Sequence, residues 1–168
     1  MPMSSERRRH RRLAGFALFE ALIAVVVASV GFIGAARLQT VGLKMNASAA
    51  VRQRAVLLSY QMTDRMRANL VGYAKTPTSA YDNPVIGSKA CLATGCTSDQ
   101  LAVADMTEWS EDISGQLPGG SGVVCVDSTP DDGTAALPAC DGVGTVLAVK
   151  IFWTDNIGTS RFTTVARP

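Results

Sequence analysis

The stretch GFALFEALIAVVVASVGFIGAA, residues 15–36, is the longest apolar run in the chain and decides its organisation. Glu20 and Ser29 are its only polar residues, and the 21 residues from Phe16 to Ala36 are about as long as a helix that spans a membrane. Five arginines, at positions 7, 8, 9, 11 and 12, precede it. Since basic flanks stay in the cytoplasm, we expect a single-pass topology with the N-terminus inside and the following domain outside.

Glu20 is the unusual residue of this run. A carboxylate in a membrane segment is unfavourable, by about 2.5–3.5 kcal/mol at the centre of the helix and by less near its end. Glu20 is therefore expected to have a charged partner. The alternative is that its side chain extends to the lipid headgroups, which a position near the start of the helix permits.

The order of the N-terminal features differs from that of a cleavable secretory signal, whose small-residue cleavage site follows the apolar run. Here a small residue, Gly15, stands before the run. The segment from Gly15 to Glu20 resembles the type IV prepilin signal, which a prepilin peptidase cuts between a glycine and an aromatic residue. Phe19 departs mildly from that family, which more often has an aliphatic residue there. An uncleaved signal anchor is the alternative and gives the same topology.

The resemblance implies how this N-terminus is processed and used. Residues 1–15 would be a cleaved basic leader, with the cut between Gly15 and Phe16 and N-methylation of Phe16. Glu20 would then be the fifth residue of the mature chain, where the family has its glutamate. In filaments of that family this glutamate is thought to meet the N-terminal ammonium of a neighbouring subunit. Such a pair would offset the desolvation of both charges, so Glu20 would dock subunits and not catalyse a reaction.

A long helix is predicted to start with the apolar run. No proline occurs between Met3 and Pro77, and we expect one helix from Phe16 to about Val71, about 80 Å long. Residues 16–36 form its membrane or filament-core half, and residues 37–71 form an amphipathic half that packs against a soluble domain. Residues on one face of this second half recur at steps of three and four: Val41, Met45, Ser48, Val51, Ala55, Leu58, Met62 and Met66.

Charge is divided unevenly along the rest of the chain. Seven cations lie between Arg37 and Lys75, where Asp64 is the only acid, whereas residues 76–168 contain four cations and eleven acids. Without residues 1–15 the formal net charge changes from +2 to −2. A basic helix before an acidic head suggests electrostatic fitting within or between subunits. No nucleic-acid partner is expected, because that would require cations clustered on the head.

The head, residues 72–168, is predicted to be α+β. Residues 72–97 are rich in turn-forming residues, and residues 97–117 read as a helix, in one or two pieces, with Asp105 and Glu108 at capping-box spacing. Strand-like runs follow at residues 122–127, 145–154 and 161–166, with a hairpin turn at Asp155–Gly158. The expected fold is a long N-terminal helix whose second half packs against a small antiparallel sheet.

The four cysteines all follow the apolar run, and an exported chain with an even number of cysteines favours disulfides. The simplest pairing is Cys91 with Cys96 and Cys125 with Cys140; two other pairings remain open. We expect no metal site. The cysteine spacings do not match zinc, and the only histidine lies in the leader. Asp131 and Asp132 lie in a turn, where solvation is the default and calcium binding the minor alternative.

No catalytic set is found, so the protein is not expected to be an enzyme or to need a cofactor. The region after the leader has no histidine for a serine–histidine pair, and neither cysteine pair has the two-residue spacing of a thioredoxin-like motif.

The order of features in the head resembles the PilV group of minor pilins. A tryptophan-containing helix that ends in Leu-Pro-Gly-Gly is followed by a strand, a cysteine-bounded excursion and a Val-x-Ile-x-Trp strand. Major pilins usually have a proline at the position of Arg37, so a minor subunit fits better. The implied location is the inner membrane, with a periplasmic head, and then the pilus at the cell surface.

The resemblance implies a subunit that helps to prime or joins the type IV pilus and supports piliation, twitching motility and adhesion. Its partners would be the prepilin peptidase, other minor pilins, the major pilin and a tip adhesin. Two alternatives remain: a minor pseudopilin of a type II secretion system, and an unprocessed, membrane-anchored periplasmic binding domain.

Overall fold

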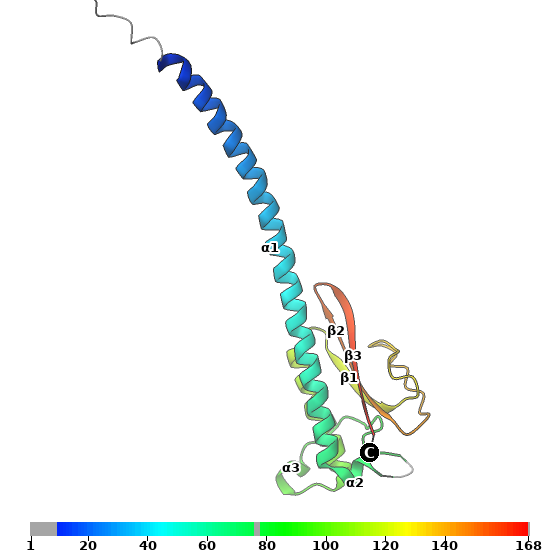
Figure 1. Ribbon diagram of the computed structural model, residues 1–168. Helices are drawn as coiled ribbons and strands as arrows, with labels where there is room; N and C mark the ends of the chain where they lie inside the picture. The colour runs from blue at the N-terminus through cyan, green and yellow to red at the C-terminus, as the bar shows by residue number, and fades with distance from the viewer. Residues whose placement is uncertain (1–9, 76–77, 168) are drawn as a thin grey trace, which may run out of the picture. The chain divides into compact units, whose positions relative to one another are not determined.

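The computed structural model describes residues 10–75 and 78–167, with side chains from residue 17 onward. The described elements, in chain order, are four helices followed by three strands (Figure 1). The chain divides into two compact units, Met1–Met45 and Asn46–Pro168, which are described separately below. The elements are α1 (His10–Ala68), α2 (Leu70–Tyr73), α3 (Cys91–Thr94), α4 (Ser98–Gln116), β1 (Ser121–Val126), β2 (Leu147–Asp155) and β3 (Gly158–Ala166).

The long N-terminal helix is confirmed, with different ends. Helix α1 has 59 residues and begins at His10, six residues before the predicted start. It ends at Ala68, just before Asn69, whose side chain accepts a hydrogen bond from the backbone N–H of Gly72 and caps the short helix α2. An asparagine in this position satisfies a helix-terminal donor that would otherwise have no partner. The helix predicted to reach Val71 is therefore two helices.

The first unit contains the apolar part of α1. Every side chain from Ala17 to Met45 is exposed. This stretch gives α1 the length and composition needed to cross a membrane, and α1 is the one described helix that meets both conditions. The polar side chain Ser29 is satisfied within the helix, because its hydroxyl donates to the carbonyl oxygen of Val25 at 2.7 Å. The segment therefore needs an apolar environment from outside its own unit.

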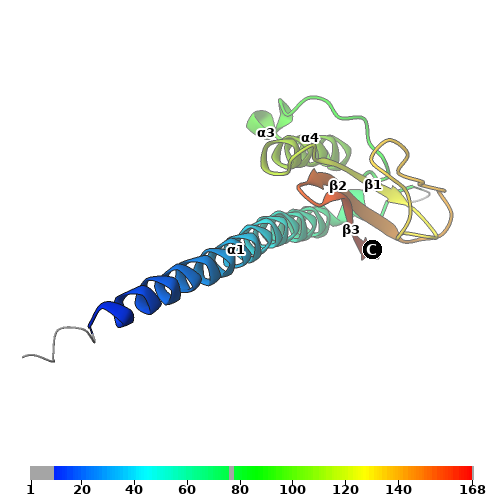
Figure 2. The ribbon, with the colours of Figure 1, turned by 90° about the horizontal axis from the view of Figure 1, so that it is seen from above.

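The second unit buries one face of α1 against α4 and the sheet (Figure 2). The predicted face is correct for its C-terminal part, since Ala55, Leu58, Met62 and Met66 are at most 1% exposed. It is wrong for Val41 and Met45, which are 53% and 62% exposed. The residues that cover this face belong to the unit that starts at Asn46. The apolar periodicity of α1 therefore extends further toward the N-terminus than the covered part of the helix.

The sheet is an antiparallel meander in the order β1-β2-β3. The predicted hairpin is present: Asp155 pairs with Gly158, and the register continues to Leu147 opposite Ala166 without interruption. Seven consecutive residues of β2, Leu147 to Trp153, are buried. Strand β2 is thus covered on both faces. The odd-numbered residues join the core with the helices, and the even-numbered ones face the connection between β1 and β2.

Helix α4 is a single helix capped by Thr97, not by Asp105. The Thr97 hydroxyl accepts from the backbone N–H of Gln100, and the Gln100 side chain accepts from the backbone N–H of Thr97. This reciprocal pair is the capping box that the sequence placed eight residues later. Asp105 lies inside the helix, where it accepts a hydrogen bond from Tyr81 at 2.5 Å. The Asp105–Glu108 spacing therefore reflects tertiary contacts and not a helix start.

A pair of glycines tests how tightly α4 packs against β1. A Cβ at Gly122 would lie 2.5 Å from Ile113 Cδ1 and 2.6 Å from the Trp109 ring, whereas one at Gly115 would meet nothing within 4 Å. We expect Gly122→Ala to lower the free energy of unfolding by about 1–3 kcal/mol through overpacking. Gly115→Ala, in α4, should raise the free energy of unfolding by about 0.5–1 kcal/mol. Urea unfolding monitored by tryptophan fluorescence measures both, and equal effects would contradict this packing.

Candidate assembly helix and cysteine-closed head loop

The predicted processing site lies within α1. Gly15 and Phe16 belong to its helical backbone, while the leader up to residue 9 and the side chains of both residues lie outside the described part. Glu20 follows one turn later with an exposed side chain. It lines an open, shallow and apolar groove on the helix surface. The other residues of the groove are Phe19, Ile23, Ala24, Val27 and Ala28.

The described side chains around Glu20 are apolar, and none of them is a cation. Leu18 and Phe19 beside it are 74% and 64% exposed, and no ion pair of Glu20 occurs among the residues that the structure describes. If this surface enters lipid or a helical bundle, the carboxylate must be neutralised or paired there. The chemistry that this site can perform is charge pairing in an apolar interface.

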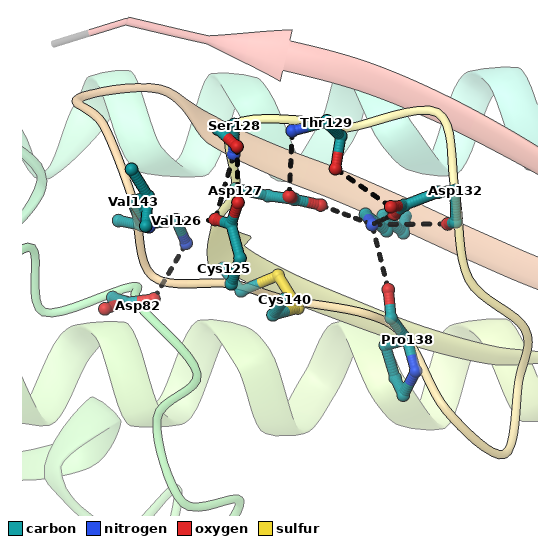
Figure 3. The surroundings of a disulfide bond; sticks show 12 residues. Asp82, Cys125, Val126, Asp127, Ser128, Thr129, Asp132, Pro138, Cys140 and Val143 are labelled. Atoms are coloured by element: carbon teal, nitrogen blue, oxygen red, sulfur yellow. Dashed lines mark hydrogen bonds and ion pairs between the residues drawn. A yellow bond between two sulfur atoms is a disulfide. The ribbon is translucent and has the colours of Figure 1, made fainter.

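Both disulfides have the pairing that the spacing favoured. Cys91 and Cys96 enclose α3, with their Cα atoms 4.8 Å apart. Cys125 and Cys140 are joined with their Cα atoms 6.0 Å apart, which ties the end of β1 to residues 127–146, the β1–β2 loop (Figure 3). The second bridge therefore holds the loop close to the strand from which it departs.

The β1–β2 loop is also held by a buried lysine that projects from the centre of β2. Lys150 is completely buried and forms an ion pair with Asp127, whose side chain is also inaccessible. Its ammonium donates to Asp132 Oδ1 at 2.8 Å and to the carbonyl oxygen of Pro138 at 2.8 Å. Figure 3 shows these three acceptors on the loop. Lys150 thus satisfies its three donors with loop atoms and fixes the loop over the sheet.

Arg161 of β3 makes a second set of contacts with the same loop. Its guanidinium donates to the carbonyl oxygen of Gly133 at 2.7 Å and to Asp131 Oδ1 at 2.9 Å. The two adjacent aspartates considered for calcium therefore each face a cation, Asp131 facing Arg161 and Asp132 facing Lys150. In the described residues no group of three or more His, Cys, Asp or Glu side chains could hold a metal ion.

A further polar network joins α1, α4 and the segment between α2 and α3. The Tyr81 hydroxyl donates to Asp105 at 2.5 Å and accepts from Asn69 Nδ2 at 3.2 Å. Arg65 lies near the same carboxylate, at 3.5 Å, and donates to Glu108 at 2.8 Å. Burial and the bond to Asp105 raise the pKa of Tyr81 far above its usual value. Arg65 of the basic part of α1 is therefore paired with acidic residues of α4 within the second unit.

Alkaline pH should reveal the Lys150 contacts. Burial lowers the pKa of Lys150, but the hydrogen bonds with Asp127 and Asp132 outweigh this, so the pKa lies above its usual value. The stability that this raised pKa contributes is fully present below the pKa of lysine in the unfolded chain, about 10.4. It is lost as the pH rises through the pKa of Lys150 in the folded chain. We expect the free energy of unfolding, measured with urea, to fall as the pH rises above about 10. The fall should be less steep in Lys150→Met than in the wild-type chain. Equal slopes would contradict the assignment.

The two disulfides should contribute unequally to stability. The Cys125–Cys140 bridge closes a separation of 15 residues, and replacing both cysteines with serine should cost about 3 kcal/mol by chain entropy. The Cys91–Cys96 bridge closes five residues, and its removal should cost about 2 kcal/mol. Urea unfolding of the two double-serine variants measures the difference. A larger loss for Cys91 and Cys96 would show that the long loop keeps its shape without its bridge.

The cysteines that hold the loop are apparent in the sequence, but the pairing of Lys150 with Asp127 is not. Lys150 and Asp127 lie within the strand-like runs at residues 145–154 and 122–127, and neither run by itself indicates a contact with the loop. The available signal was one cation in a strand otherwise composed of buried residue types. A lysine in the middle of such a strand predicts a buried carboxylate partner, although the spacing alone does not identify it.

Comparisons with protein-family models, with curated proteins and with solved structures found no match for this chain.

Proposed function

We propose that this chain is a minor type IV pilin of the PilV group, a structural subunit that is held in the inner membrane and then joins the pilus. The observation that carries the proposal is the apolar segment of α1. All its described side chains are exposed, and it contains a single carboxylate, Glu20. A helix of this kind is suited to lipid first and then to a bundle of equivalent helices.

The sequence before this segment is the second support. Gly15 and Phe16 stand where the prepilin signal has its cleavage site, and cleavage there would create an ammonium group four residues before Glu20. In an assembled filament the ammonium of one subunit and the Glu20 carboxylate of its neighbour would neutralise each other. The proposed role is therefore mechanical, without catalysis or a cofactor: helix packing and this ion pair join the subunit to the filament.

The folded second unit is suited to a periplasmic and extracellular environment. It carries two disulfides, and the β1–β2 loop is held by a disulfide and by Lys150. Oxidised cysteines are typical of exported domains, especially small ones with a limited core. We propose that this unit contacts other minor pilins, the major pilin or a tip adhesin.

The test is N-terminal analysis and intact mass of the protein from its own cells, comparing membranes with sheared surface filaments. We expect a chain that begins at N-methylated Phe16 and is present in the filament fraction. A chain that keeps residues 1–15 in wild-type cells would contradict the proposal and favour the unprocessed, membrane-anchored binding domain.

The type II secretion pseudopilin is separated by phenotype. Both subunits would be processed at Gly15, but loss of a minor pilin should reduce surface piliation, twitching or attachment. Loss of a pseudopilin should instead impair the export of secreted enzymes. A deletion that changes none of the pilus traits would count against the proposed function even if the chain is processed.

A further inference from the structure

The two outer strands of the sheet differ in how their free edges are covered. The outer edge of β1 is closed by other parts of the unit. The carbonyl oxygen of Val124 accepts from the backbone N–H of Asn83 at 2.8 Å. The backbone N–H of Val126 donates to Asp82 Oδ1 at 2.8 Å, a contact visible in Figure 3. A row of unpaired backbone groups is therefore avoided on this side.

Among the described residues, none forms a hydrogen bond that covers the outer edge of β3 in this way. The two-residue hairpin closes with the pair Asp155 and Gly158, and pairs that exchange hydrogen bonds alternate from there along the ladder. Every second residue of β3 consequently points its backbone N–H and C=O away from β2. In the part of the chain that the structure describes, these groups make no hydrogen bond. We call them the open edge: Thr159, Arg161, Thr163 and Val165.

The open edge also lacks the features that usually prevent strand pairing. Strand β3 has nine residues without proline or lysine, and its register with β2 has no bulge. Its one charged side chain, Arg161, is turned to the β1–β2 loop and bonded there. Natural proteins commonly protect such an edge with charge, proline, a bulge or a covering segment. An unprotected edge of this length is suited to receiving another strand.

A cation on the helix next to β3 indicates the charge of the partner. Ser59 Oγ of α1 lies 3.3 Å from Thr164 Oγ1, so α1 runs next to β3. Arg52 is seven residues before Ser59, which places it two turns away on the same side of the helix. It is exposed and has no ion pair among the described residues. From this helical spacing we infer that a strand added to β3 would pass near this guanidinium.

We propose that the open edge binds an extended, proline-free segment of a different polypeptide as a fourth strand, with an acidic side chain of that segment paired to Arg52. The β3 strand of a second copy fits less well, because it contains no acidic residue and would leave Arg52 unpaired. The inference goes beyond the proposed function and does not depend on it, since any partner that supplies such a strand would bind.

The test uses the full chain in detergent micelles and synthetic eight-residue peptides. The probe alternates threonine and valine and has one central glutamate; one control has lysine in place of the glutamate, and another has prolines. Hydrogen exchange followed by mass spectrometry reports on β3. We expect the glutamate peptide to protect roughly four amides, those of the open edge, and the proline peptide to protect none. The lysine peptide should bind about twofold to fivefold more weakly.

Two variants sharpen the result. Thr163→Pro removes an outward N–H and leaves the β2-facing bonds of β3, so it should abolish protection, while Ala135→Pro in the exposed β1–β2 loop should not. Arg52→Glu should reverse the preference between the glutamate and lysine peptides. If Thr163→Pro fails to fold, the wild-type exchange pattern and Arg52→Glu still decide the question.

Three results would overturn the inference. The first is unchanged exchange of β3 at millimolar glutamate peptide. The second is protection confined to other elements. The third is protection of β3 that rises with protein concentration in the absence of peptide, which would identify a second copy as the occupant. None of these results bears on processing at Gly15, so the inference and the proposed function fail independently.

Discussion

Replacing Lys150 with methionine should lower the free energy of unfolding by about 3–5 kcal/mol, because it leaves the buried carboxylate of Asp127 without a cation. Lys150 is completely buried, and Asp127 is 1% exposed. Water cannot replace the lost ammonium without disturbing the β1–β2 loop. The loss therefore includes the desolvation of an unpaired charge as well as the contacts to Asp132 and Pro138.

An exposed ion pair supplies the matched control. Lys75 Nζ lies 2.6 Å from Asp99 Oδ2, but both side chains are about half exposed. Lys75→Met should lower the free energy of unfolding by no more than about 1 kcal/mol. An exposed ion pair is only slightly more stable than the two side chains separately hydrated. Urea unfolding of the full chain in micelles measures both variants. The only tryptophans, Trp109 and Trp153, are both buried in the second unit and report on its unfolding.

A double variant separates the charge from the packing. Asp127→Asn removes the anion and keeps an oxygen that can accept from the backbone N–H of Thr129, as Asp127 Oδ1 does at 3.0 Å. Combined with Lys150→Met, it should recover part of the loss, since no uncompensated charge remains buried. A double variant whose loss equals or exceeds the sum of the two single losses would mean that packing of the lysine stem, and not charge, dominates.

The elements of this fold could be predicted from local signals. The absence of proline between Met3 and Pro77, the apolar periodicity from Ser48 onward and the strand-like runs are properties of short windows. The cysteine spacings of five and fifteen residues also favoured the observed pairs on their own. Such signals are readable because the local conformational preference and the tertiary contacts of these segments agree.

The contacts that close the head could not be predicted in the same way. The partner of Lys150 depends on the path of the β1–β2 loop, and alternation along β2 says only that one face differs from the other. Asp105 has capping-box spacing with Glu108, but Tyr81 and Arg65 reach it from distant segments. Local patterns identify where a helix is possible. They do not identify which side chains the rest of the chain brings to it.

The candidate functional features likewise fall into those that the sequence reveals and those that it does not. Gly15, Phe16 and Glu20 are recognised from consecutive residues, so the sequence alone suggests their role. The open edge of β3 is invisible there, because it depends on what covers β1 and leaves β3 uncovered. A sequence that reads as three strands does not reveal which edge of the sheet is closed.

Glu20→Gln should reduce incorporation of this chain into surface filaments by about 100-fold or more. The proposed pair between the Glu20 carboxylate and the ammonium of a neighbouring subunit is desolvated, and removing one partner of such a pair costs about 3–5 kcal/mol. A loss of this size corresponds to more than two powers of ten in an equilibrium constant. Glutamine keeps the shape of the side chain and leaves the neighbour's ammonium unpaired.

Membrane insertion and processing should be unaffected by the same change. A neutral amide is easier to place in lipid than a carboxylate, and Gly15 and Phe16 are untouched. Ser29→Ala is the matched control within the same segment. Among the described residues its hydroxyl bonds only to the carbonyl oxygen of Val25 in its own helix, so incorporation should remain near the wild-type level. Quantitative immunoblots of membrane and sheared-filament fractions measure the ratio, and mass spectrometry confirms the mature N-terminus.

The charge requirement can be separated from the shape requirement with a third variant. Glu20→Asp keeps the carboxylate but shortens the side chain by one methylene, so it should restore part of the incorporation lost in Glu20→Gln. Equal losses of incorporation in the glutamine and aspartate variants would indicate that docking requires the length of the side chain as well as its charge. Normal incorporation of Glu20→Gln would show that the carboxylate has no partner in the filament. Its place in an apolar helix would then have to be explained by extension toward the headgroups.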